Sequence, residues 1–98
     1  MIKISYRPLE QSGSLEILTY LLKKSEAKLT DILAHVRSFG IGQSAMYKSL
    51  KLLKEHSLID ETITDYPKLR LIRLTEKGKK VAEKILEIKE ILESNDLL

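Results

Sequence analysis

Residues 41–59 have the sequence IGQSAMYKSLKLLKEHSLI, and the organisation of the whole chain can be worked out from this stretch. Met46, Leu50 and Leu53 recur at helical spacing, which predicts an apolar stripe on a helix running from about Gln43 to His56. The opposite face of that helix carries mostly polar and cationic side chains: Ser44, Tyr47, Lys48, Lys51 and Glu55. The stretch therefore predicts a helix that is anchored on one side and free to contact a partner on the other.

Two further helices are predicted before it. The first covers about 14–24 with Ser14 as its N-cap, and the second covers about 31–38 with Thr30 as its N-cap. The glycines of Phe39-Gly40-Ile41-Gly42 then permit a tight turn. This turn joins the helix at 31–38 to the helix at 43–56, and two short helices joined in this way form a helix-turn-helix unit.

The pattern changes to period two after this unit, which predicts a β-hairpin over 59–74. Asp65-Tyr66-Pro67-Lys68 forms its turn, with proline at a typical turn position. A very short additional strand is predicted at Lys28 and Leu29. Leu58 and Ile59, at the start of the hairpin, are expected to pack in the core.

A last helix follows, capped by Thr75. Val81, Ile85, Ile88 and Leu92 lie on it at spacings of four, three and four, which gives a heptad-like apolar seam. This seam would pair two subunits. The alternative is that the helix folds back on its own core.

These elements predict one domain over 1–98, because a chain of 98 residues supports one modest core. The fold class is mainly α with a small β-hairpin, in the order α-β-α-α-β-β-α. Within it we expect an extended N-terminal arm over 1–13 with a short strand at Ile2–Tyr6. A core follows over 14–74, then a dimerising helix over 75–93 and a frayed tail over 94–98.

Charge is distributed unevenly along the chain. The net charge is +3, but residues 66–80 alone carry +5 and residues 42–56 carry +2, while residues 81–98 carry −3. Segregated positive charge of this kind indicates a polyanionic partner. An ordinary solvated surface is the alternative.

Several function classes are excluded by composition. The chain has no cysteine and two histidines, His35 and His56, which we expect to be surface or boundary residues rather than metal ligands. No acid–base pair at a telling spacing and no phosphate-binding loop is present, so we predict neither an enzyme nor a cofactor. No apolar run is long enough to cross a membrane, and the N-terminus lacks signal-peptide features, which predicts a cytoplasmic protein without a membrane partner. Abundant Lys and Glu with a single Asn are typical of a thermophilic source.

Two motifs together resemble a known superfamily. Residues 41–59 are similar to the recognition-helix stretch of winged-helix transcription regulators of the MarR and PadR kind, and Leu74-Thr75-Glu76-Lys77-Gly78-Lys79 is similar to their junction between the wing and the last helix. The resemblance covers about 14–92 and implies a homodimer on a palindromic operator. In layout the chain is also similar to small archaeal winged-helix proteins with a C-terminal dimerising helix. Gly42 and Ser57 depart from the family, which usually has Ser or Thr at the first position and glycine at the second.

The resemblance assigns the outward face of helix 43–56 to the major groove of double-stranded DNA and the hairpin, or wing, to the backbone or minor groove. Side chains that can pair with base edges are expected to give sequence preference, and the others to bind phosphates. The base-edge candidates are Gln43, Ser44 and Lys48; the phosphate candidates are Tyr47, Lys51, Lys68 and Arg70. For Tyr47 the alternative is packing under the wing, and for Lys51 an ordinary solvated face.

Three functions remain open at this point. The leading one is a sequence-specific DNA-binding transcription regulator that acts as a homodimer. The second is an archaeal-type chromatin protein with weak sequence preference, and the third is a protein-interaction winged helix that does not bind DNA. A small-molecule effector is neither indicated nor excluded by the sequence.

Overall fold

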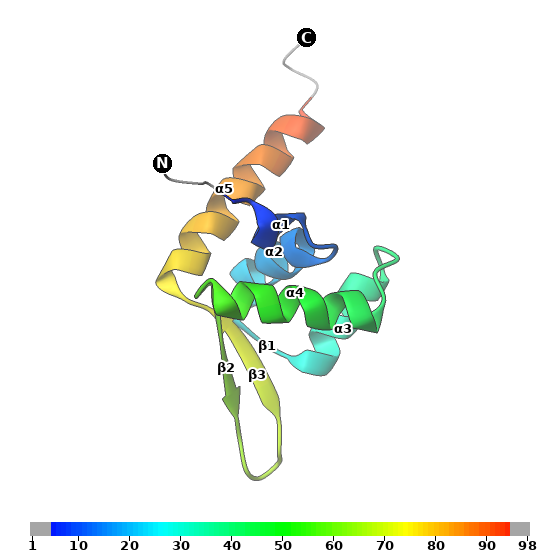
Figure 1. Cartoon of the computed structure of the whole chain (residues 1–98), viewed down its shortest axis with the longest axis vertical. Coiled ribbons are helices and arrows are strands. Elements are labelled where there is room, and N and C mark those ends of the chain that lie inside the picture. The colour runs from blue at the N-terminus through cyan, green and yellow to red at the C-terminus, as the bar shows by residue number, and fades with distance from the viewer. Residues whose placement is uncertain (1–4, 95–98) are drawn as a thin grey trace.

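A computed structural model describes residues 5–94 of the chain, and Figure 1 shows its arrangement. It contains five helices and three strands within those residues. They are α1 (Arg7–Glu10), α2 (Ser14–Lys24), β1 (Glu26–Lys28), α3 (Leu29–Arg37), α4 (Gln43–Glu55), β2 (Ile59–Ile63), β3 (Arg70–Leu74) and α5 (Glu76–Glu93). From α2 onward this is the predicted order, so the fold class is confirmed.

The N-terminal segment differs from its prediction. The arm was expected to be extended, but α1 is a short helix with proline in its first turn, where the fixed φ of proline favours helix. Pro8 is buried and Leu9 packs against the core, so burial holds this segment in place. Of the predicted strand at 2–6, residues 2–4 lie outside the described residues, and Ser5 and Tyr6 are not in a strand.

Two predicted helix starts are also wrong by one or two residues. Gly13, with φ of 100°, is the N-cap of α2, and Ser14 is the first helical residue with a fully buried side chain. Lys28 caps α3 in place of Thr30, because β1 occupies 26–28 and its last extended residue leads directly into the helix. The short strand predicted at 28–29 is therefore β1, shifted toward the N-terminus.

The three strands form one antiparallel sheet in the order β1-β3-β2. Ile72 at the centre of β3 faces Ala27 of β1 and Glu61 of β2 across the sheet. Because β3 lies between the other two strands, the hairpin is fastened to the body at its base. Its far end projects away from the helices (Figure 1).

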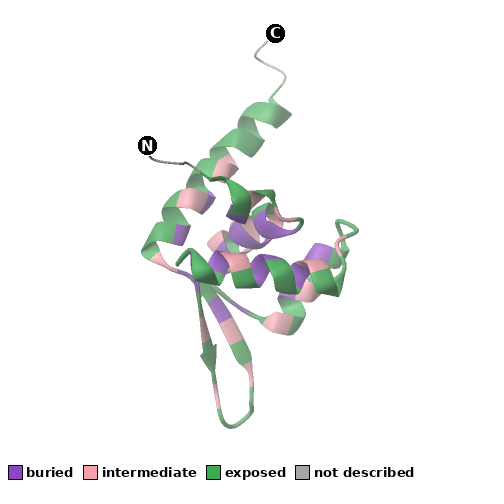
Figure 2. Ribbon diagram, viewed as in Figure 1, coloured by how far each residue is buried: buried purple, intermediate pink, exposed green. Residues whose placement is uncertain are grey.

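The core lies where α2, α3 and α4 meet the base of the sheet, as the buried segments in Figure 2 show. The predicted stripe of α4 is confirmed, since Met46 and Leu53 are fully buried and Leu50 nearly so. Leu58 and Ile59 also lie in the core, as predicted.

The junction between α4, the sheet and α5 is tightly built. Ser57 has φ of 60°, the left-handed conformation that glycine adopts at less cost, so serine at this position costs up to roughly 1 kcal/mol. Thr75 caps α5 as predicted: its hydroxyl accepts a hydrogen bond from the Gly78 amide and donates one to the Ser57 carbonyl. These contacts fix both the wing and α5 relative to the end of α4.

The apolar seam predicted on α5 divides into two halves. Val81 and Ile85 are half-buried and pack against the core, so the alternative that the helix folds back on its own domain holds for them. Ile88 and Leu92 are exposed, on the part of the helix that extends beyond the body in Figure 1. No helix within the described part of the chain is long and apolar enough to span a membrane.

Candidate nucleic-acid interface

The outward face of α4 brings together five of the predicted site residues. All five are exposed, while Met46, Leu50 and Leu53 anchor the helix from below. Gly42 is the N-cap of α4 and has an extended backbone. Because glycine has no side chain, the N-cap residue offers no side-chain hydrogen bond to the first amides of the helix. The five residues are Gln43, Ser44, Tyr47, Lys48 and Lys51.

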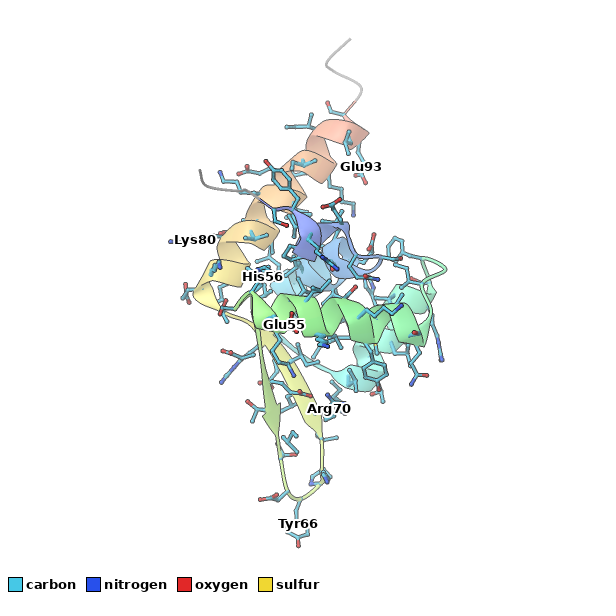
Figure 3. All side chains as sticks on the ribbon, in the orientation of Figure 1. Glu55, His56, Tyr66, Arg70, Lys80 and Glu93 are labelled. Atoms are coloured by element: carbon cyan, nitrogen blue, oxygen red, sulfur yellow. The ribbon has the colours of Figure 1, made fainter. Side chains whose placement is uncertain are left out.

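A groove separates α4 from the wing. Tyr47, Lys51 and Lys54 line it from the helix, and Glu61 and Arg70 line it from the hairpin. Tyr47 is 40% exposed and adjoins Arg70, so it borders the groove without being buried under the wing. Figure 3 shows Arg70 on β3, in the part of the hairpin below α4. Tyr47 and Arg70, which were both predicted to contact phosphates, therefore belong to one continuous surface.

Glu61 is a member of this groove that sequence analysis did not identify. Its side chain is only 12% exposed and forms two ion pairs, at 2.7 Å with Lys54 Nζ and at 2.5 Å with Arg70 Nε. The hydrogen bond from Arg70, followed by that from Lys54, lowers the pKa of Glu61 to about 2. Side chains alternate along a strand, so Glu61 lies on the same face of β2 as Ile59, but no sequence signal indicates which cations it meets.

Replacing Glu61 with glutamine is expected to lower the free energy of unfolding at pH 7 by about 1 kcal/mol, because both cations are nearly half exposed and solvent weakens the pairs. The Glu61 pKa is lower in the folded than in the unfolded chain. Its pairs therefore stabilise the fold above about pH 4.5 and are lost as the pH falls toward 2. Urea denaturation should show the difference between wild type and Glu61→Gln shrinking between pH 5 and pH 2. A difference that does not change with pH would contradict the ion-pair assignment.

The wing carries the remaining predicted contacts. Its turn is closed by Thr64, whose hydroxyl donates to the Pro67 carbonyl and accepts from the Leu69 amide at 3.0 Å. Lys68 is exposed in this turn. Tyr66, which sequence analysis did not single out, is 98% exposed and points away from the body at the tip (Figure 3).

Arg73 lies on the opposite face of β3 from Arg70, since side chains alternate along a strand. Its partners across the sheet are the acidic residues Glu26 and Asp60. The structure therefore separates Arg73 from the groove and from the outward face of α4.

The two histidines are boundary and surface residues, as expected. His35 is half-buried and stacks on Tyr20 with ring centres 4.3 Å apart, and His56 is exposed at the end of α4. Within residues 5–94 no three His, Asp or Glu side chains gather at a position that could hold a metal ion.

No protein-family model matches the sequence, and the comparison with curated proteins gives no match. Among solved structures, AF1382 from Archaeoglobus fulgidus is 25% identical with a TM-score of 0.74, over 91% of this chain and 97% of that one. F-93 from SSV1 is also 25% identical, with a TM-score of 0.69, over 82% of this chain and 88% of that one.

A MarR family transcriptional regulator from Silicibacter pomeroyi, SPO1453, superposes with a TM-score of 0.67 at 18% identity. The match covers 82% of this chain and 54% of the regulator, so the chain spans about half of that protein's length. The chain has the winged-helix fold, as the two sequence motifs implied. In this fold α4 occupies the position that the resemblance assigned to the recognition helix, and β2, β3 and their turn form the wing.

Proposed function

We propose that the protein is a transcription regulator that binds double-stranded DNA in a sequence-specific manner. The observation that carries this proposal is the outward face of α4, where polar and cationic side chains stand over a buried apolar stripe beside the wing groove. A helix fits the major groove of B-DNA, which is about 12 Å wide. DNA as the partner places the protein in the cytoplasm with the nucleoid.

The residues take different roles in this proposal. Gln43, Ser44 and Lys48 lie in the N-terminal half of α4 and contact base edges, since Gln can pair with adenine and Lys can donate to guanine. Tyr47 and Lys51 contact phosphates and set the register of the helix. Lys68 and Arg70 of the wing contact the backbone or the adjacent minor groove.

The protein acts as a homodimer in this proposal, through the exposed half of α5. Ile88 and Leu92, which are 57% and 79% exposed, border an apolar groove between α2 and α5. The same groove is lined by Leu15, Tyr20 and Phe39, so the apolar surface extends beyond the α5 seam itself. Contiguous exposed apolar surface of this kind is typical of an interface. Two subunits paired there would contact two half-sites of a roughly palindromic operator.

Replacing both Ile88 and Leu92 with aspartate is expected to give monomers, because two carboxylates from each subunit would have to be buried at the interface. Both side chains are exposed, so the fold itself should survive. The same substitutions at Val81 and Ile85 would disturb the fold, because those side chains pack against the core. Light scattering measures the mass, and circular dichroism checks the helix content. Glu83→Gln with Glu90→Gln, two exposed positions elsewhere on α5, is the control and should stay dimeric. A fully dimeric double aspartate variant would contradict the interface.

Selection from a random-sequence duplex library, repeated over a range of salt concentrations, tests the function. An enriched palindromic site that survives physiological salt is the expected result. Binding without enrichment and with a steep salt dependence would replace the regulator with the chromatin role, since binding would then rest on phosphates alone. No binding at low salt would overturn DNA binding and favour protein interaction.

A further inference from the structure

The short helix α1 is packed on the recognition helix, on the opposite side from the wing (Figure 1). Buried Pro8 and the adjacent Leu9 attach it to the body. The hydroxyl of Ser49, buried on α4, donates a hydrogen bond of 2.6 Å to the Ser12 carbonyl just after α1. Recognition helix and α1 are therefore one connected unit.

A second hollow results on this side of α4. Arg7 and Gln11 line it from the N-terminal segment, and Lys48, Lys51 and Glu55 line it from α4. Lys51 and Glu55 also border the wing groove, so the outward ridge of α4 stands between two hollows. Each hollow has cationic walls.

The cations of the two hollows differ in their pairing. On the wing side, Glu61 holds Lys54 and Arg70 in ion pairs. On the α1 side, none of Arg7, Lys48 and Lys51 forms an ion pair with any residue in the range 5–94. Glu55 lines the hollow and Glu10 lies in α1 with Arg7, and neither is among the ion-paired carboxylates of residues 5–94. A phosphate that binds Arg70 must compete with a carboxylate already in place, whereas a phosphate that binds Arg7 displaces only solvent and salt ions.

We propose that α1 is part of the DNA interface and that Arg7 binds a backbone phosphate on the flank of the major groove opposite the wing. The inference rests on the proposed function and deepens it. The α1 flank contributes more counterion release than Arg70 does, even though the wing is the element that projects farther. Arg7 carries no base preference, because a phosphate contact is independent of sequence.

The test is the slope of log affinity against log salt on a selected duplex and on a random-sequence duplex. It is measured for wild type, Arg7→Ala, Arg7→Lys and Arg70→Ala. Loss of one phosphate contact lowers the magnitude of the slope by about 0.9, so a homodimer that loses one contact in each subunit should lose about 1.8. Arg7→Ala should show that loss, by the same amount on selected and random sequences. Arg7→Lys should keep the wild-type slope because it keeps the charge, and Arg70→Ala should change the slope by less than Arg7→Ala.

Arg73→Ala is the matched control, since Arg73 is an exposed arginine on the sheet face turned away from the groove, and it should leave the slope unchanged. Thermal melting of each variant shows whether the fold is intact. A wild-type slope for Arg7→Ala, or a larger change for Arg70→Ala, would overturn the inference while leaving DNA binding in place. A wild-type protein that binds no duplex would overturn both.

Discussion

Replacing Gly78 with alanine is expected to lower the free energy of unfolding by at least about 3 kcal/mol. A Cβ atom at this position would lie 1.9 Å from the Leu58 carbonyl oxygen and 2.9 Å from its carbon. The atoms in the way belong to the Leu58 backbone, which cannot change rotamer as a side chain can. The helix α5 would therefore have to move away from the end of α4. That movement would also break the contacts of Thr75 with Ser57 and Leu58.

Urea denaturation followed by circular dichroism measures this effect. Gly42→Ser is the control, because no atom beyond the two adjacent residues lies within 4 Å of the Cβ position at Gly42 and its backbone is extended. Serine is a good N-cap, so that variant should change stability by only a few tenths of a kcal/mol. A Gly78→Ala variant as stable as wild type would show that α5 is not in close contact with Leu58.

Replacing Tyr47 and Lys48 together with alanine is expected to weaken DNA binding at least tenfold, which is about 1.4 kcal/mol. The two side chains lie next to each other on the exposed face of α4, one bordering the wing groove and the other the α1 hollow. Neither belongs to the core, so the fold should be retained. Affinity for the selected duplex is measured by fluorescence anisotropy, and the helix content by circular dichroism.

Lys80 and Lys84 provide the control for this experiment. Both are exposed on α5, away from α4, and their replacement with alanine removes one positive charge more than the test variant does. That control should bind more tightly than the Tyr47 and Lys48 variant. Unchanged affinity in the latter, with a folded domain, would remove α4 from the DNA interface.

The helix α4 could be predicted from sequence because its signal is strong and local. Met46, Leu50 and Leu53 specify the buried face over a helix with few competing patterns, and the tight turn before it contains glycine. The wing was predictable for a similar reason, because the period-two pattern of its two strands and the proline in the turn between them both indicate a hairpin. The motif around Gly78 pointed to the fold, and the approach of Leu58 gives its physical reason.

The features that sequence analysis missed depend on contacts between distant parts of the chain. Whether α1 is an arm or a helix is decided by the burial of Pro8 against the body, which no four-residue pattern encodes. The pairing of Glu61 joins α4, β2 and β3, so its partners become neighbours only after folding. The apolar seam of α5 is periodic over its whole length, but only Val81 and Ile85 pack against the core, while Ile88 and Leu92 stay exposed.

The most direct test of DNA binding by α4 is an NMR titration of the labelled protein with the selected duplex, following the amide of each residue. We expect the largest shifts along 42–51 and around Lys68 and Arg70, with α1 also affected and residues 83–93 unaffected. Shifts confined to α5 and the groove between α2 and α5, or no shifts at low salt, would contradict the account.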